Sequence, residues 1–238
     1  MSLIGVLGGM GPSATVDFMA KIIQLTPATR DQEHLPVIIA NLPHVPDRSS
    51  AILGRGEDPL PALLRGIDML NQAKVGVLAI PCNSSHHWYT EMAERSDAPI
   101  IHIAQACVAA IPASHQGRIA VLATRGALAS GFYQEALRAR GLEFVVPDES
   151  TTQHQVDACI KAIKAGDIVG GTVALDAVLT TVAAAGATAA ILGCTELPVA
   201  ARAAQRTSMV LIDSSLELAR ATVTFALDKG WNQPTWLS

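Results

Sequence analysis

The stretch VGVLAIPCNSS, residues 75–85, decides the fold class. Its apolar residues form an uninterrupted run without in/out alternation, which is typical of a parallel strand covered by helices on both faces of the sheet. The stretch AAILGCTE, residues 189–196, repeats the arrangement. In both, an apolar run is followed by a cysteine, Cys82 or Cys194, and then by small polar residues that can open a helix. The pattern indicates two half-sites that face each other.

Similar apolar runs alternate with helical patterns along the chain, which is the order expected of an α/β protein. Strands are predicted at residues 3–7, 36–40, 75–80, 99–101, 118–122, 142–145, 188–192 and 209–211. Predicted helices include residues 14–25, 59–72, 129–140 and 152–165.

A weak internal repeat predicts two lobes. Residues 4–11 resemble residues 119–126, and the two cysteines are separated by nearly the same number of residues as these segments. Such a repeat predicts two similar α/β lobes, each giving a first-strand loop and a cysteine loop to a shared cleft. We assign residues 1–112 and about 213–238 to the first lobe, and residues 113–212 to the second.

The composition limits the partners. The 238 residues are 50% hydrophobic and 16% charged, with a formal charge of −4, which suits a globular protein with substantial cores. The weak acidic balance and the lack of basic clusters argue against nucleic acid or an anionic membrane. No apolar run reaches the roughly 18 residues of a membrane span, and the first residues lack the basic segment of a signal peptide. We therefore expect a cytoplasmic protein.

The four cysteines fall into two groups. None forms a C-x-x-C pair, so neither a zinc ribbon nor a thioredoxin-type motif is indicated. Cys107 and Cys159 lie inside helical patterns, where cysteine usually behaves as a small buried hydrophobe. Cys82 and Cys194 are predicted at the carboxyl ends of parallel strands, where open α/β sheets bind ligands.

The position of these two thiols suggests proton transfer. A helix N-terminus beside each would favour the thiolate. One thiolate next to a substrate carbon can remove a proton while a thiol on the other face returns one. That arrangement inverts a stereocentre without a cofactor. The alternative is that both cysteines only fill the core.

Polar residues near the thiols suit a small anion. Asn83 and Ser84 follow the first thiol, Thr195 follows the second, and Thr124 follows the first strand of the second lobe. Such side chains, together with helix N-terminal amides, can hold a carboxylate. Each residue can equally be an ordinary helix cap.

Two cations are further candidates. Arg48 lies in a proline-punctuated loop after the second strand, and its guanidinium fork matches a carboxylate. The alternative for Arg48 is a solvated side chain paired with Asp47. Lys164 lies at the end of a predicted helix, where lysine often complements the helix dipole. From the residues alone, a surface role is favoured for Lys164.

Two other motifs predict less. Residues 9–14 satisfy G-x-G-x-x-G/A after a strand, but Asn41 follows the second strand where a dinucleotide fold has an acid. These glycines are better explained by close approach of the backbone to a ligand. His86 and His87 stand one turn after Cys82, and at most one of them can face the thiol. We interpret both as packing and capping residues.

These motifs together resemble the cofactor-independent aspartate/glutamate racemase family, and within it the aspartate racemase branch. The resemblance covers nearly the whole chain, because the following elements occur in family order: GVLGGMGPSAT (5–15), N-x-P-x-x-P-D-R (41–48), PCNSSHHW (81–88), VLATRG (121–126), IKAG (163–166) and LGCTELP (192–198). Pro81 and Glu196 favour the aspartate branch, since the glutamate branch usually has ACNT and GCTH.

The resemblance implies a fold and a mechanism. It implies two α/β lobes related by pseudo-twofold symmetry, with Cys82 and Cys194 as two bases on opposite faces of the substrate α-carbon. It implies no cofactor, neither pyridoxal phosphate nor a metal. It also implies a small acidic amino acid as the substrate and a homodimer as the assembly.

The resemblance also implies residue roles. Arg48 and Lys164 match positions implicated in binding the side-chain carboxylate, and Met10 matches a loop residue that lines the pocket. The positions that hold the α-carboxylate and amino groups are matched by Asn83, Ser84, Thr124 and Thr195. The chain departs from the family pattern at Ser84, Ser85 and Ala127, and the loss of a hydroxyl at Ala127 concerns substrate identity more than chemistry.

The prediction is thus an isomerase: a racemase of aspartate or a related acidic amino acid that does not use pyridoxal phosphate. Other chemistry of the same superfamily remains an alternative, of the maleate isomerase, hydantoin racemase or malonate decarboxylase type, with one cysteine as nucleophile or lone proton donor. A third alternative is a non-catalytic binding protein for acidic ligands.

Overall fold

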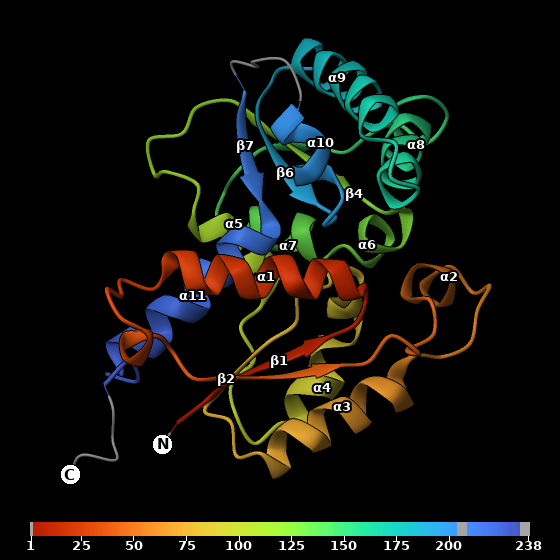
Figure 1. The fold of residues 1–238 in the computed structure, drawn as a ribbon. Coiled ribbons are helices and arrows are strands. Elements are labelled where there is room, and N and C mark those ends of the chain that lie inside the picture. The colour runs from red at the N-terminus through yellow and green to blue at the C-terminus, as the bar shows by residue number, and fades with distance from the viewer. Residues whose placement is uncertain (1, 204–208, 234–238) are drawn as a thin grey trace.

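Two parallel sheets form the framework of the computed structural model, which describes residues 2–203 and 209–233 (Figure 1). The first sheet contains β1 (Ile4–Gly8), β2 (Val37–Asn41) and β3 (Val77–Ala79) in the order β2-β1-β3. The second contains β4 (Arg118–Ala123), β5 (Phe144–Val145), β6 (Ala187–Gly193) and β7 (Val210–Asp213) in the order β5-β4-β6-β7. The predicted α/β class with two similar lobes is confirmed, because β4, β5 and β6 reproduce the order of β1, β2 and β3.

Helices cover both sheets. Around the first sheet lie α1 (Pro12–Leu25), α3 (Leu60–Gln72), α4 (Tyr89–Arg95) and α5 (Ile103–Ala109), with short helices α2 (Arg48–Ile52), η1 (Asp31–Glu33) and η2 (Ser84–Trp88). Around the second lie α6 (Arg125–Ser130), α7 (Phe132–Ala139), α8 (Thr152–Lys164), α9 (Ile168–Ala184) and α10 (Leu197–Ala203). No helix in the described part of the chain is long and apolar enough to cross a membrane.

The central strands are apolar because both of their faces are covered. All five residues of β1 are buried, and so are six of the seven residues of β6. Four core residues of the two sheets, Ile4 and Val6 with Ile119 and Val121, belong to one continuous apolar cluster and are fully buried. One apolar cluster is therefore common to the two lobes, and each lobe adds a cluster of its own.

The last helix completes the first lobe. Helix α11 (Ser214–Asp228) follows β7 of the second sheet directly and packs against α1 and α5. Its buried side chains include Leu218, Ala219 and Val223, which lie in the shared cluster. The exact limits of the two lobes, at residues 112/113 and 212/213, stay a prediction.

Two sequence-based elements differ in the structure. Residues 99–101 do not form a named strand, because only one parallel bridge, Leu78 to Ile100, joins them to β3. Residues 129–140 are not one helix, because Gly131 has φ +76° and separates α6 from α7. A left-handed glycine of this kind ends a helix at low steric cost.

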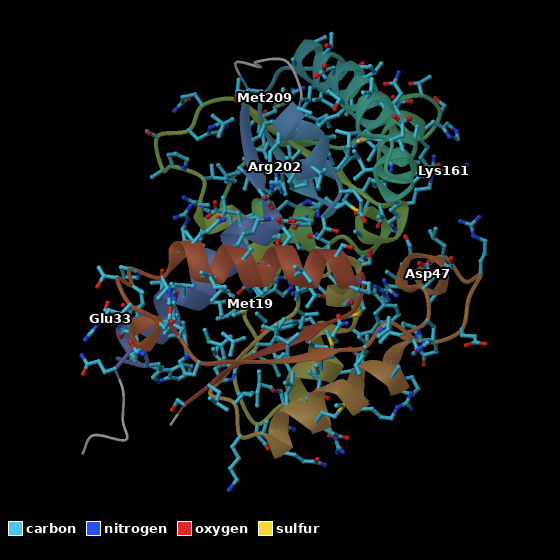
Figure 2. All side chains as sticks on the ribbon, viewed as in Figure 1. Met19, Glu33, Asp47, Lys161, Arg202 and Met209 are labelled. Atoms are coloured by element: carbon cyan, nitrogen blue, oxygen red, sulfur yellow. The ribbon has the colours of Figure 1, made fainter. Side chains whose placement is uncertain are left out.

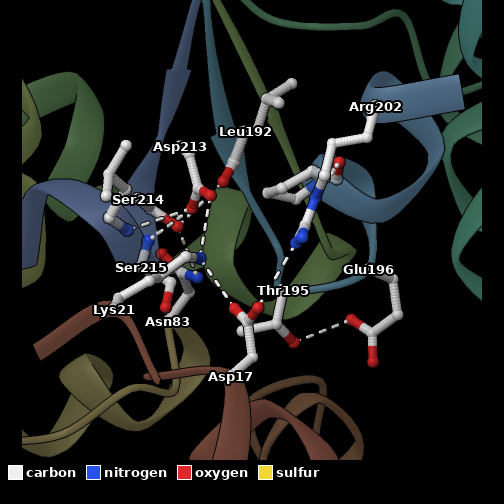
Figure 3. Close-up of polar contacts among 12 residues, drawn as sticks. Asp17, Lys21, Asn83, Leu192, Thr195, Glu196, Arg202, Asp213, Ser214 and Ser215 are labelled. Carbon is white, nitrogen blue, oxygen red and sulfur yellow. Dashed lines mark hydrogen bonds and ion pairs between the residues drawn. The ribbon is translucent and has the colours of Figure 1, made fainter. Parts of the chain in front are cut away.

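Ion pairs join α1 to the second lobe. Arg202 on α10 reaches Asp17 on α1, with 3.3 Å between Nη2 and Oδ1 (Figure 3). The Nζ atom of Lys21 lies 2.7 Å from Oδ2 of Asp17 and 2.8 Å from Oδ2 of Asp213 (Figure 3). Asp213 in turn accepts hydrogen bonds from the backbone N–H groups of Ser215 and Leu216 and so caps α11.

We expect Lys21→Ala to lower the free energy of unfolding by about 2 kcal/mol, the value of a hydrogen bond to a charged group, because Asp17 and Asp213 lose the cation that they share where the lysine is 7% exposed. Urea denaturation measures the change. Arg30→Ala is the matched control, since Arg30 is 71% exposed in its pair with Glu33 and such pairs contribute little. Equal stability of the two variants would contradict the assigned role of Lys21.

Candidate active site

One cavity collects the residues singled out in the sequence. It measures about 470 Å³, including the part open to solvent, and lies at the carboxyl ends of the strands of both sheets. All nine predicted site residues line it: Met10, Arg48, Cys82, Asn83, Ser84, Thr124, Lys164, Cys194 and Thr195. Four unassigned residues also line it: Asp47, Ser49, Gly193 and Glu196.

The two cysteines reach the cavity from equivalent strands. Cys82 follows β3, which pairs with β1, and Cys194 follows β6, which pairs with β4. The cysteines are 7% and 8% exposed, so both are largely withdrawn from solvent while still lining the cavity. In contrast, Cys107 and Cys159 have no exposed surface and lie in the apolar clusters, which confirms their predicted place in the core.

Glu196 is the direct partner of Cys194. The Sγ atom of Cys194 donates to Oε2 of Glu196 at 2.9 Å, and Oγ1 of Thr195 donates to the same oxygen at 3.1 Å. Nζ of Lys164 lies 4.0 Å from the other carboxylate oxygen. Burial and the neighbouring carboxylate raise the pKa of the Cys194 thiol well above its usual value, and Lys164 offsets only part of this. Burial and the Glu196 carboxylate therefore both act against the thiolate that a helix N-terminus was expected to favour at Cys194.

His86 holds the backbone of Cys82 and does not contact its thiol in the structure. Nδ1 of His86 lies 3.0 Å from the carbonyl oxygen of Cys82, and the N–H of Ile103 donates to Nε2 at 3.2 Å. These two partners require the proton on Nδ1. Burial and the neighbouring His102 lower the pKa of His86 to about 3, so the ring stays neutral. His87 contacts Ser130 of α6 instead. The interpretation as a packing and capping residue is confirmed for His86, which is buried and accepts from the first residue of α5, whereas His87 is exposed.

Backbone carbonyls hold the guanidinium of Arg48 at the cavity. Nη1 donates to the carbonyl oxygens of Val45 and Pro46 at 3.0 and 2.9 Å, and Nη2 donates to that of Met10 at 3.3 Å. The Nε atom is buried and has no partner among the described residues. Of five N–H donors, three are thus in use. Arg48 is not the solvated partner of Asp47, whose carboxylate accepts from Ser50 and caps α2.

Hydroxyl groups join the two lobes across the cavity. Oγ of Ser84 and Oγ1 of Thr124 are 3.0 Å apart, and Thr124 also caps α6 by accepting from the N–H of Ala127. Next to them, the N–H of Gly126 donates to Oγ of Ser49 on α2 at 3.1 Å. These contacts bring the polar groups of both lobes to one wall of the cavity. Capping and lining the cavity are therefore compatible roles for Thr124.

Asn83 is fixed at both ends of its amide. Its Oδ1 accepts from the hydroxyl of Tyr133 at 2.5 Å. Its Nδ2 donates to Oγ of Ser214 at 3.1 Å, and Figure 3 labels both Asn83 and Ser214. Ser214 donates in turn to the carbonyl oxygen of Leu192 at 2.8 Å. The second Nδ2 hydrogen is the group that Asn83 has left to offer a ligand.

Lys164 is the last residue of α8 and lines the cavity at its mouth. Lys161 lies one turn earlier on the same helix, and Figure 2 shows it above Asp47. The Lys164 side chain is 62% exposed, which agrees with the surface position favoured from the residues alone, and it also lines the cavity; a role in the site stays a prediction. Met10 lines the cavity with its loop, and its sulfur accepts from Ser85. Of the four unassigned residues, Asp47, Gly193 and Glu196 belong to motifs of the family resemblance, whereas Ser49 carries no sequence signal.

The fold and the cavity together define a two-lobed α/β protein with a small, polar, cysteine-lined site between its lobes. The pattern of the Asp/Glu/hydantoin racemase family matches residues 7–222. The chain is 31% identical over 229 residues to the broad specificity amino-acid racemase RacX of Bacillus subtilis, covering 93% of this chain and 97% of that protein. The chain therefore belongs to the Asp/Glu/hydantoin racemase family, whose members are isomerases of small amino-acid substrates.

Solved structures agree with this assignment. The aspartate racemase of Picrophilus torridus superposes with a TM-score of 0.82 at 28% identity, covering 95% of this chain and 94% of that one. The glutamate racemase of Francisella tularensis, in complex with D-glutamate, gives a TM-score of 0.70 at 18% identity, covering 98% and 84%. The second likeness concerns the fold alone.

Proposed function

We propose that this protein is a racemase independent of pyridoxal phosphate, and that it inverts the α-carbon of aspartate or a related acidic amino acid with Cys82 and Cys194 as the two bases. One observation carries the proposal: cysteines that follow equivalent strands of two sheets line the same cavity. Family membership supports the reaction class. A non-catalytic binding protein for acidic ligands would need polar groups to hold its ligand but no pair of thiols in the cavity.

The proposed reaction moves one proton in and one proton out. In one direction the Cys82 thiolate takes the α-proton: the C–H bond breaks, an S–H bond forms, and the electron pair stays on the substrate, delocalised into its α-carboxylate. The Cys194 thiol then protonates the opposite face and is left as the thiolate. The reverse direction exchanges the two roles, so no oxidant or reductant is needed.

Glu196 sets the starting state of this cycle. Because Cys194 donates to Glu196 and its pKa is raised, the free protein holds Cys194 as the thiol. It is therefore placed to act as the acid in the direction in which Cys82 removes the α-proton. Glu196 is also the acceptor placed to receive the proton when the opposite direction requires a Cys194 thiolate.

Arg48 supports an acidic substrate. Its buried Nε–H has no partner among the described residues, and one Nη2 hydrogen is also left, so the guanidinium keeps two donors that are not used within the protein. A carboxylate is the ligand that accepts two such hydrogen bonds at once. Lys164 at the mouth adds a second cation. The hydrogen-bond donors of Arg48 and Asn83 also stabilise the negative charge that develops on the substrate in the transition state.

A wider substrate range is the second candidate. A neighbouring cavity shares Met10, Arg48, Lys164, Thr195 and Glu196 with the site and continues past them over residues 9–14. It offers room to side chains longer than that of aspartate. The likeness to a racemase of broad specificity supports the same candidate.

Proton NMR in D₂O tests both candidates. Each enantiomer of aspartate, glutamate, alanine and lysine is incubated with the protein, and loss of the α-proton signal is followed together with the enantiomer ratio. Exchange and inversion confined to aspartate and glutamate support the acidic-substrate proposal. Equal turnover of alanine and lysine would support the wider substrate range. Maleate is incubated separately, and its consumption without any α-hydrogen exchange in the amino acids would overturn both candidates. The homodimer that the family resemblance implies is tested by light scattering, and the cytoplasmic location expected from the sequence is tested by cell fractionation.

Glu196→Gln is expected to move the alkylation of Cys194 to lower pH. The amide removes the negative charge that raises the pKa of the thiol, while the burial that also raises it remains. The thiolate therefore forms at lower pH, and iodoacetamide labelling of Cys194, measured by mass spectrometry against pH, follows it. Glu91→Gln, at an exposed position of α4, is the matched control. An unchanged or upward shift would contradict the role of Glu196.

A further inference from the structure

Tyr133 touches the segments that carry both thiols. The side chain comes from α7 and is completely buried, and it is the largest side chain among the fully buried residues. Its hydroxyl donates to Oδ1 of Asn83, the residue after Cys82. Its ring lies against Gly193, the residue before Cys194, so closely that a Cβ at Gly193 would stand 3.1 Å from Cε2 of the ring.

Only one assignment of donors and acceptors satisfies all the hydrogen bonds around Tyr133. Leu192 offers a carbonyl oxygen, so Ser214 must donate to it and can only accept from Asn83. The Asn83 atom next to Ser214 is therefore the nitrogen, and the other atom is the oxygen, which accepts from the Tyr133 hydroxyl. That hydroxyl in turn accepts from the thiol of Cys107 at 3.7 Å.

This chain of donors connects the two thiol loops through the core. It begins at Cys107 on α5, passes through Tyr133, Asn83 and Ser214, and ends at the carbonyl of Leu192, two residues before Cys194. Burial raises the pKa of both Tyr133 and Cys107, so their hydrogens stay in place over the working pH range. The amide of Asn83 cannot turn over without breaking two buried hydrogen bonds.

We propose that Tyr133 is a positioning residue: its ring and hydroxyl set the separation of the Cys82 and Cys194 loops and hold Asn83 with an N–H toward the cavity. This rests on the proposed racemase reaction, in which both thiols must address one carbon atom from opposite faces. Misplacement by about 1 Å costs such a reaction on the order of 10²-fold. A donor fixed at Asn83 also favours a carboxylate of the substrate over its ammonium group.

Tyr133→Phe tests the proposal, because it removes the hydroxyl and keeps the ring. With L-aspartate and then D-aspartate in D₂O, two rates are measured: α-hydrogen exchange into the remaining substrate and formation of the other enantiomer. The expected result is a kcat at least about tenfold lower and a higher ratio of exchange to inversion, since a proton removed by one thiol is less often replaced by the other. A mere loss of folded protein lowers both rates equally and leaves the ratio unchanged.

Tyr89→Phe is the matched control. Its hydroxyl donates to the carbonyl of Ile100 at 3.1 Å, a contact that involves neither thiol loop, so kcat and the ratio should stay within twofold of the wild type. If Tyr133→Phe does not fold, Ser214→Ala breaks the next link with Tyr133 intact and should raise the same ratio. If the wild type is active and folded Tyr133→Phe has the same ratio of exchange to inversion, the positioning role of Tyr133 is overturned and the proposed function is not. A wild type that neither exchanges nor inverts overturns the proposed function as well.

Discussion

Replacement of either Cys82 or Cys194 by alanine is expected to abolish inversion of the substrate, with a loss of about 10²- to 10⁴-fold or more in kcat. Each variant keeps one thiol, so each should still exchange the α-hydrogen of one enantiomer in D₂O. The enantiomer that exchanges should be opposite in the two variants, because the two thiols address opposite faces. Proton NMR with pure L- and D-aspartate measures this.

Cys159→Ala is the control for these two variants. Cys159 is fully buried in the core between α8 and the second sheet and does not line the cavity, so its loss should leave kcat unchanged. Circular dichroism establishes that all three variants are folded. Inversion at a near wild-type rate in either the Cys82 or the Cys194 variant would falsify the two-base mechanism.

Arg48→Lys is expected to raise KM for aspartate and lower kcat/KM by about 10- to 100-fold, which corresponds to the 1.5–3 kcal/mol of a hydrogen bond to a charged group. The charge remains, but lysine cannot offer the two fixed donors of a guanidinium to a carboxylate. Steady-state kinetics with aspartate and with alanine separate two roles. If Arg48 holds the side-chain carboxylate, only aspartate is affected.

Two controls accompany the Arg48 variant. Arg55→Lys changes an exposed arginine on the loop after α2 and should leave the kinetics unchanged. Circular dichroism is required as well, because Arg48 also supplies hydrogen bonds to the carbonyls of Val45, Pro46 and Met10. Wild-type KM values for both substrates would contradict any role of Arg48 in substrate binding.

The fold followed from local sequence signals where burial alone decides structure. Uninterrupted apolar runs predicted β1, β3, β4 and β6, because a strand covered on both faces has no polar positions. The signals failed where tertiary contacts decide: residues 99–101 lie beside β3 and form a single bridge to it, and Gly131 ends a helix whose apolar pattern continues. The low helix propensity of glycine was a signal for this break, but the apolar pattern on both sides of Gly131 favoured a single helix.

The site was predictable to the extent that its residues follow strands. Strand ends gave Cys82, Cys194, Thr124 and Asn83, since parallel sheets gather these positions at one edge. Lys164 needed the family resemblance, because a lysine at the end of a helix has the same local pattern whether or not it faces a site. Ser49 and Tyr133 act through partners on the opposite lobe, and no local pattern records such a partner.

The place of α11 in the chain has a consequence for the order in which this protein is made. The helix packs against α1 and α5, yet it is encoded after the entire second sheet. During translation the apolar faces of α1 and α5 therefore emerge long before the helix that covers them. The first lobe to leave the ribosome is the last to be finished, and any chaperone that attends this chain would find its target on those two faces.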